Sequence, residues 1–507
     1  MDTYLSHSST ILADVKEIII DFFNVSEMMS SDIVENKVRN HFDRLKPNLY
    51  FLIETNYIDK IYRDSYYNYF STKLKVFNRN SIKISIFNCP LSIESFRDED
   101  SKAKLKENYF GFFILRPTPP NVIGRSVINP NALNNNNFTT CLAYIPSTVN
   151  SIKFDSVGFP HSSQDSETMT CAETTLWSVM EYFGNKYPEY KPILPSQIIE
   201  LLRNSTNERQ LPSTGLNINQ MSYVLKEFGF APKIYSKSEY GSETFFKLIS
   251  CYIESGIPLI ISLDNLNYLK SPGAIHDYIG HAVLCTGHED VADIMIDSLV
   301  PIDISRFSNQ NIKIFDFDDT KKRFVFIDDN HPIYQKAVLN NPTEHYNNQS
   351  WNTCEISHFI APLYRKVYLE AYEAKQLAIT FLTNSVFCLD NESEVLMRSF
   401  LTSSRSYKQY VALNSTIDNY LKDEILELEM PKFIWIFELS NKDIFKKGMI
   451  DGLLIFDATE PKSKNYESLI VAIHSNSIVK YSKNVKSLEK ISLHLQPFLK
   501  FNSNLKK

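Results

Sequence analysis

The sequence predicts an α+β protein. Apolar residues recur every three or four positions in several segments, which is the spacing of amphipathic helices. Short apolar runs bounded by Gly, Pro or polar residues occur between residues 82 and 128 and again from residue 259 onward, as in buried strands. Helices and strands are therefore expected in separate stretches rather than in strict alternation, which is typical of the α+β class.

Length and composition set the number of domains. A chain of 507 residues is long enough for two to four domains. Its 43% hydrophobic and 22% charged residues are ordinary for a globular protein, so each part can bury a core of its own. The pattern divides the chain into a helical and β-hairpin region at 1–150, a central domain at 151–365, and an α+β companion domain at 366–507.

Charge and cysteine content exclude several classes of function. The net charge of −6, without a long basic stripe, argues against a nucleic-acid-binding role. The first residues lack the charged start and apolar core of a signal peptide, and no apolar run approaches the roughly 18 residues of a spanning helix. A cytoplasmic protein without a membrane contact is expected. The seven cysteines include no Cys-x-x-Cys pair, so neither a disulfide framework nor a metal site is expected.

The N-terminal region is expected to begin with helices and to continue with strands. Apolar residues from Leu12 to Phe23 fall on one helical face, and the pattern resumes after a polar break up to Phe42. A further helix is expected at 57–70. The strands that follow are expected at 82–87, 109–117 and 123–128, of which the last two form a hairpin-like unit.

An irregular segment at 154–164 leads to the stretch around which the middle of the chain is organised. Residues 164–184 predict a polar loop that runs into a helix, because apolar residues recur at helical spacing and Gly184 ends the run. Cys171 lies in the first turn of this helix. Unpaired backbone N–H groups and the positive end of the helix dipole favour an anion there, so a thiol at this position loses its proton more easily and becomes a nucleophile.

A thiolate nucleophile also needs a base, and the base needs a group that orients it. Later in the chain, His281 opens an apolar run that is typical of a buried strand. A second apolar run ends in Asp328, Asp329 and Asn330, and any of the three could face the histidine. We select Asp328, because it directly continues the apolar strand. The chain then carries a cysteine on a helix, a histidine on a strand and an acid at the end of the next strand.

The remaining elements surround this order of residues. Helices are expected at 195–202, 217–228 and 245–254, followed by a strand at 259–263. Beyond residue 366, helices are expected at 369–381 and 393–410, the second with Arg398 exposed, and strands at 433–439, 452–459 and 469–473. This last part carries no candidate nucleophile with a neighbouring base, so it is expected to bind a partner or a substrate.

The middle of the chain resembles the papain-fold cysteine peptidases. The resemblance is carried by the segment from Gln164 to Cys171, by the Gly-His-Ala-Val step at 280–283, and by the strand that ends in Asp328. It is closest to the branch that includes the leader-peptide peptidases of bacteriocin exporters and related bacterial proteins. It covers roughly residues 158–335 and implies a two-lobed domain with a cleft between the lobes.

The same resemblance implies a function and a role for each residue. The activity would be hydrolysis of a peptide or isopeptide bond in a peptide or protein substrate, without a cofactor. The roles would be nucleophile for Cys171, general base for His281, orienting group for Asp328 and oxyanion-hole donor for Gln164. Two alternatives stay open: acyl transfer to an amine by the same triad, as in transglutaminases, and a non-catalytic papain-like binding scaffold in a larger assembly. The flanking domains suggest narrow or regulated activity and a possible protein partner.

Overall fold

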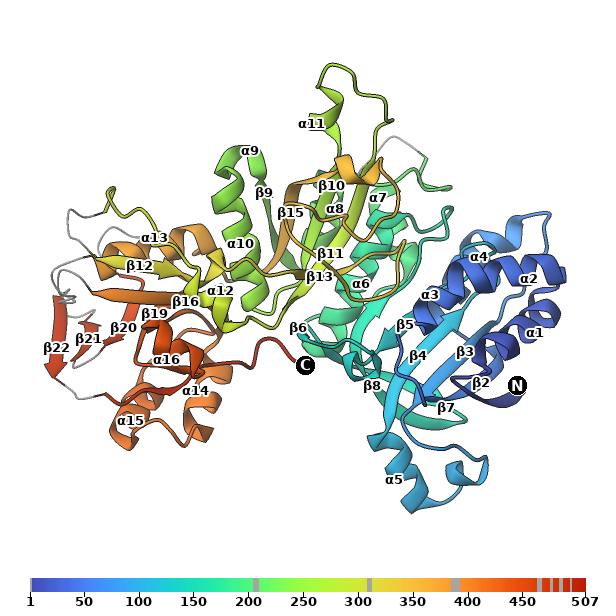
Figure 1. Cartoon of the computed structure of the whole chain (residues 1–507), viewed down its shortest axis with the longest axis horizontal. Coiled ribbons are helices and arrows are strands. Elements are labelled where there is room, and N and C mark those ends of the chain that lie inside the picture. The colour runs from blue at the N-terminus through green and yellow to red at the C-terminus, as the bar shows by residue number, and fades with distance from the viewer. Residues whose placement is uncertain are drawn as a thin grey trace.

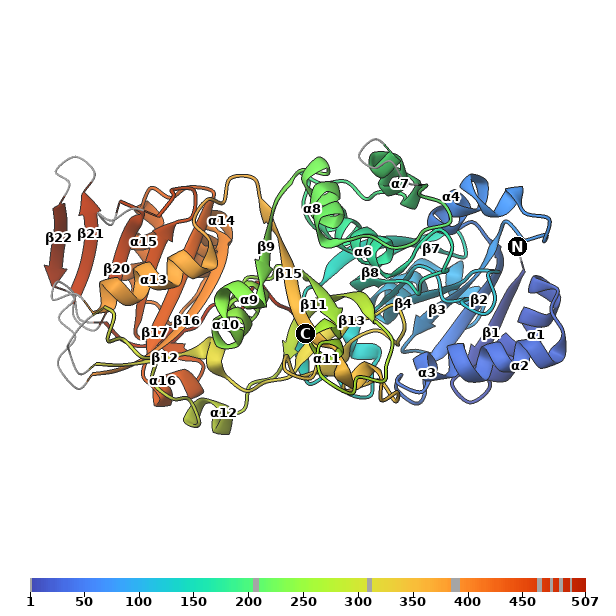
Figure 2. The same cartoon turned by 90° about the horizontal axis from the view of Figure 1, so that it is seen from above.

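The computed structural model describes residues 2–507 except 204–208, 308–311, 384–392, 463–466, 475–476, 483–486 and 493–494. It is a mixed α+β protein in which three large sheets follow one another along the longest axis (Figures 1 and 2). Among the described helices, none is both long and apolar enough to cross a membrane. Six cysteines are free thiols, and Cys388 lies outside the described residues.

The N-terminal sheet is antiparallel, with the strand order β1-β2-β3-β4-β5-β8-β7. Its strands are β1 (Thr3–His7), β2 (Tyr50–Tyr57), β3 (Ser81–Phe87), β4 (Tyr109–Leu115), β5 (Ser126–Ile128), β7 (Ala143–Val149) and β8 (Ile152–His161). The helices of this part are α1 (Ile11–Phe23), α2 (Glu27–Ile33), α3 (Arg39–Phe42), α4 (Lys60–Asn68) and α5 (Glu99–Glu107). The predicted pairing of 109–117 with 123–128 is present as the contact between β4 and β5.

Two strand predictions for this part are wrong. Helices do not precede all strands, because β1 comes before α1 and β2 lies between α3 and α4. β2 pairs with β1 on one side and β3 on the other, and this central position buries Phe51 to Thr55. Residues 154–161 are not irregular but belong to β8, whose backbone pairs with both β5 and β7. In both cases pairing with other strands of the sheet decides the structure.

The central sheet is also antiparallel, in the order β14-β13-β11-β10-β15-β9, and β6 pairs with β11. Its strands are β6 (Phe138–Thr140), β9 (Phe230–Ser236), β10 (Leu259–Asp264), β11 (Gly280–Glu289), β13 (Phe324–Ile327), β14 (Gln335–Ala337) and β15 (Glu355–Tyr364). The helices around it are α6 (Cys171–Lys186), α7 (Pro195–Arg203), α8 (Ile218–Glu227), α9 (Lys237–Tyr240), α10 (Ser242–Glu254), α11 (Leu266–Leu269) and α12 (Asp293–Asp297).

Helix α6 lies between the N-terminal and central sheets, and every residue from Ala172 to Phe183 is buried. On one side Tyr182 stacks on Phe159 of β8, with ring centroids 5.1 Å apart. On the other side the Thr175 hydroxyl donates to a β11 carbonyl over 3.2 Å. This two-sided packing buries the polar residues of α6 together with its apolar ones and fixes the position of its first residue.

The central sheet separates two hydrophobic cores. Along β11, Ala282 and Leu284 join the core that contains α6 and the N-terminal sheet. Val283 and Cys285 join the core that contains α10 and one face of the C-terminal sheet. This alternation is that of a strand buried on both faces, and it ties the central sheet to both neighbouring parts of the chain.

The C-terminal sheet has the order β12-β16-β17-β19-β20-β21-β22, with β12 parallel to β16 and the other pairs antiparallel. Its strands are β12 (Lys313–Asp316), β16 (Glu394–Ser403), β17 (Phe433–Ser440), β19 (Gly452–Asp457), β20 (Leu469–His474), β21 (Ser477–Ser482) and β22 (Ser487–Ser492), and a separate pair is β18 (Met449–Ile450) with β23 (Phe498–Leu499). The helices are α13 (Ala371–Leu382), α14 (Ser404–Leu413), α15 (Asn419–Glu427) and α16 (Lys442–Lys446).

The single helix expected at 393–410 is wrong. Strand β16 occupies Glu394–Ser403 and α14 begins only at Ser404. β16 lies between β12 and β17 and is buried on both faces, so its nearly continuous apolar run resembles a buried helix in sequence. Arg398, which was expected to be exposed, points into the interior with 7% of its surface accessible.

Arg398 joins the central and C-terminal sheets through a buried ion network. Its guanidinium donates to Glu254 of α10 over 2.8 Å and to Glu438 of β17 over 2.7 Å. Glu254 also lies 2.7 Å from His288 of β11 and 3.2 Å from Lys322. Removing one member of such a network leaves an uncompensated charge in the interior.

We therefore expect Arg398→Met to destabilise the protein by about 3–5 kcal/mol, because Glu254 and Glu438 lose their shared cation. The exposed Arg405 of α14 provides the control, and Arg405→Met should change stability by less than about 0.5 kcal/mol. Urea denaturation followed by circular dichroism measures both. Equal midpoints for the two variants would show that the network does not stabilise the fold.

Candidate active site

Cys171 is the first residue of α6, as the sequence predicted, and its side chain is half-buried. The helix begins with a capping box in which the Glu173 carboxylate accepts from the Thr170 backbone N–H over 3.2 Å. The backbone N–H groups of the first turn and the helix dipole favour negative charge at this end. The position therefore suits a thiolate.

A buried carboxylate holds the loop that precedes Cys171. Asp165 accepts hydrogen bonds from the backbone N–H groups of Glu167, Thr168 and Met169 over 2.9, 2.6 and 2.9 Å. Three bonds to one side chain fix a turn that has no regular secondary structure of its own. Sequence reasoning missed this residue, although Asp is a common turn residue because its side chain accepts hydrogen bonds from nearby backbone N–H groups.

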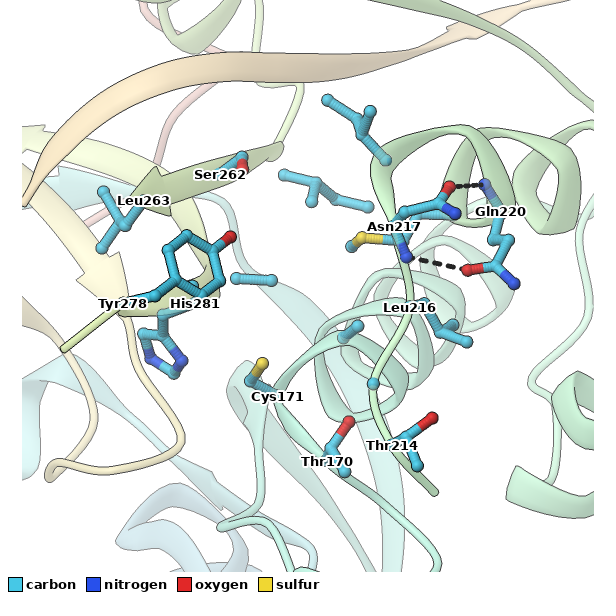
Figure 3. A pocket seen from close by; sticks show the side chains of 17 residues that line it. Thr170, Cys171, Thr214, Leu216, Asn217, Gln220, Ser262, Leu263, Tyr278 and His281 are labelled. Carbon is cyan, nitrogen blue, oxygen red and sulfur yellow. Dashed lines mark hydrogen bonds between the residues drawn. The ribbon is translucent and has the colours of Figure 1, made fainter. Parts of the chain in front are cut away.

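His281 lies near the start of β11 and is paired with Leu263 of β10. Its Nε2 atom is 3.0 Å from Asp328 Oδ1, 3.5 Å from Asp329 Oδ1 and 3.5 Å from Asn330 Nδ2. Of the three candidates left open by the sequence, Asp328 thus makes the shortest contact. This contact occupies Nε2 and leaves Nδ1 as the nitrogen available to Cys171, whose side chain lies next to His281 (Figure 3).

The histidine and the aspartate stabilise each other's charged forms. Burial lowers the pKa of His281, but the charge of Asp328, the hydrogen bond with Asp328 and the nearby Cys171 thiol outweigh burial and hold that pKa well above its ordinary value. Burial raises the pKa of Asp328, but the imidazolium and the hydrogen bonds from His281 and His345 hold it well below its usual range. An imidazolium beside a carboxylate is the state that a neighbouring thiolate requires.

The second oxygen of Asp328 is held by residues from the loop that follows β14. Tyr346 donates its hydroxyl to Asp328 Oδ2 over 2.7 Å, and His345 Nε2 lies 3.1 Å from the same atom. Trp351 stacks on Tyr346, with centroids 4.1 Å apart, and meets the His281 ring edge-on at 5.3 Å. No sequence motif marks these residues, because they reach the site only through the folding of the loop.

Gln164 does not line the cavity next to Cys171. Its Nε2 atom donates to Asn330 Oδ1 over 2.8 Å, and Asn330 in turn lies beside His281. The side chain is therefore tied into the same cluster through one intermediate residue. A primary amide has two N–H donors, so this bond leaves one donor of Gln164 for another acceptor.

Cys171 and His281 open onto a cavity of about 560 Å³. Figure 3 shows their side chains next to each other on one side of the cavity, with Tyr278 above the imidazole and the start of α8 on the opposite wall. The lining also includes Leu216, Met221 and Leu263, and it contains no Asp, Glu, Lys or Arg among the described residues. Apart from His281, the cavity thus offers an uncharged surface beside the thiol.

The structure defines an α+β protein with a Cys-His-Asp cluster at the end of its central helix. No protein-family model matches the chain, and no curated protein matches it at a significant level. The geometry of the site is therefore the main basis for an inference about function.

The protonation state of the buried Asp329 carboxyl group can be tested through the pH dependence of stability. Its carboxyl group is buried without a hydrogen-bond partner among the described residues, and burial raises its pKa to about 7 against the opposing effect of His281. Between pH 4 and 7 the folded protein retains a proton that the unfolded chain loses, so this group lowers stability by up to about 1.4 kcal/mol for each pH unit as the pH rises.

Asp329→Asn removes this titration without changing the shape of the side chain. The free energy of unfolding of the wild type, relative to the variant, should fall as the pH rises from 4.5 to 7.5. Urea denaturation at both pH values measures the difference. A constant difference between the two proteins would mean that Asp329 ionises normally in the folded state.

Proposed function

We propose that this protein is a cysteine peptidase of narrow specificity that hydrolyses a peptide or isopeptide bond. The observation that carries the proposal is the position of His281 between the Cys171 thiol and the Asp328 carboxylate. Three residues from separate parts of the chain converge there in the order that nucleophilic catalysis requires, with the nucleophile next to a base and the base next to an orienting acid.

In the proposed reaction the Cys171 thiolate attacks the carbonyl carbon of the scissile bond. His281, charged by the thiol proton, protonates the leaving amine and then removes a proton from the water that hydrolyses the thioester. Asp328 keeps Nε2 of the imidazole engaged, so that Nδ1 faces the thiol throughout. The sequence of steps needs no cofactor.

The tetrahedral intermediate carries a negative oxygen that must be stabilised. The backbone N–H of Cys171 at the start of α6 provides one donor, together with the helix dipole. We assign the second donor to Gln164, whose amide lies in the same cluster through Asn330. Because the Gln164 side chain does not reach the cavity in the free protein, this assignment requires it to turn toward the substrate.

The arrangement of elements supports a papain-like domain. Helix α6 carries the nucleophile at its first turn and packs against an antiparallel sheet, where β11 carries the histidine and the acid follows β13. Helix and sheet meet at the cavity, as the two lobes of a papain-like fold meet at its cleft. Apart from His281 the lining is uncharged, which favours a substrate with uncharged side chains next to the scissile bond. The flanking sheets offer surfaces for a protein partner.

Cleavage of a proteome-derived peptide library, followed by mass spectrometry, tests the proposal. The wild-type protein should generate new peptide termini, and Cys171→Ala should generate none, because no other group supplies the nucleophile. Addition of a primary amine separates hydrolysis from acyl transfer, which would yield amide adducts instead of free carboxylates. Equal cleavage by both proteins would refute the proposed role of Cys171.

The two neighbouring aspartates give a matched pair of variants. Asp328→Asn removes the charge that holds the imidazolium and should lower kcat/KM on the best library peptide by about 100-fold. Asp329→Asn should change kcat/KM by less than about threefold, because Asp328 makes the shorter contact with His281. The reverse order would transfer the orienting role to Asp329.

A further inference from the structure

The acid of the proposed triad and two histidines form a cluster of potential metal ligands. We propose that Asp328, His331 and His345 bind a zinc ion. One carboxylate and two imidazoles are a donor set that zinc favours, and a fourth position remains for water. The proposed zinc site is additional to the active site, and the ion takes no part in the proposed reaction. Only the consequence of zinc binding for the catalytic role of Asp328 rests on the proposed function.

The spacing of the donor atoms fits such an ion. One donor atom from each residue lies within 4.8 Å of the other two. His345 Nε2 and Asp328 Oδ2 are 3.1 Å apart. Two donors on one tetrahedral zinc, each at about 2.0–2.2 Å, are separated by about 3.4 Å. Small side-chain movements would therefore bring this pair to coordination distance.

The imidazole of His345 is held beside the carboxylate of the cluster. Its side chain is 10% exposed, and its Nε2 atom faces Asp328 Oδ2. The His331 ring lies edge-on to His345, with centroids 4.8 Å apart, so the two imidazoles meet at one point.

Access and position separate this cluster from the catalytic one. His331 and His345 are partly exposed, so an ion can enter from solvent. A second grouping, His281 with Asp328 and Asp329, is entirely buried and belongs to the proposed triad. Asp328 is common to both groupings, with Oδ1 toward His281 and Oδ2 toward His345. A zinc ion would therefore fasten the acid of the triad to the loop that contains His345.

Zinc also binds cysteine and histidine together, so the test must remove the Cys171 thiol first. Equilibrium dialysis of the full-length Cys171→Ala protein against zinc chloride should give about one zinc per chain. Adding His331→Ala or His345→Ala should raise the zinc dissociation constant by about tenfold or more, since even groups that only support a ligand contribute that much. Adding His358→Ala, a partly exposed histidine on β15, should leave it unchanged.

Circular dichroism without zinc checks that each variant is folded, and the more accessible His331 supplies a second variant if His345→Ala unfolds the loop. Absence of stoichiometric zinc from folded Cys171→Ala would overturn the proposal; if the wild type binds zinc, this result would place the ion at the Cys171–His281 pair. Stoichiometric zinc that remains after both His331→Ala and His345→Ala would overturn it as well. None of these outcomes depends on peptidase activity.

Discussion

A histidine and an aspartate lie together in the interior with a hydrogen bond of 3.0 Å between them, and the geometry of the candidate site depends on this contact. Burial alone would discharge both groups, but each stabilises the charge of the other. The aspartate is in turn held by Tyr346 and His345, so its two oxygens have fixed partners. The imidazole is thereby oriented toward Cys171, which a flexible exposed pair could not achieve.

The central sheet sets the relative positions of these groups. Strand β11 brings His281 to the cavity, β13 ends beside it, and the start of α6 places Cys171 next to His281. Alternate residues of the same strands belong to two separate cores, one shared with the N-terminal sheet and one with the C-terminal sheet. The flanking parts therefore support the site through packing, and the buried network around Arg398 adds a polar connection on one side.

Local patterns were sufficient to find the residues of the site but not their surroundings. Cys171 at a helix start, His281 at the start of an apolar strand and an acid after the next strand are each visible within about ten residues. The choice among Asp328, Asp329 and Asn330 required distances, and Tyr346 reaches Asp328 only through tertiary folding. β16 was assigned to a helix for the same reason, since strands pair with both of its edges and hydrophobic cores cover both of its faces.

The charge state of the Cys171–His281 pair is the most direct test of the proposed site. Site-resolved alkylation with iodoacetamide across pH 4 to 9, on the wild type and on His281→Ala, measures it without a known substrate. An ion pair predicts that Cys171 reacts far faster than the other cysteines below neutral pH and loses this advantage in His281→Ala. Equal reactivity of Cys171 and the other cysteines, or the same profile in both proteins, would contradict a catalytic thiolate.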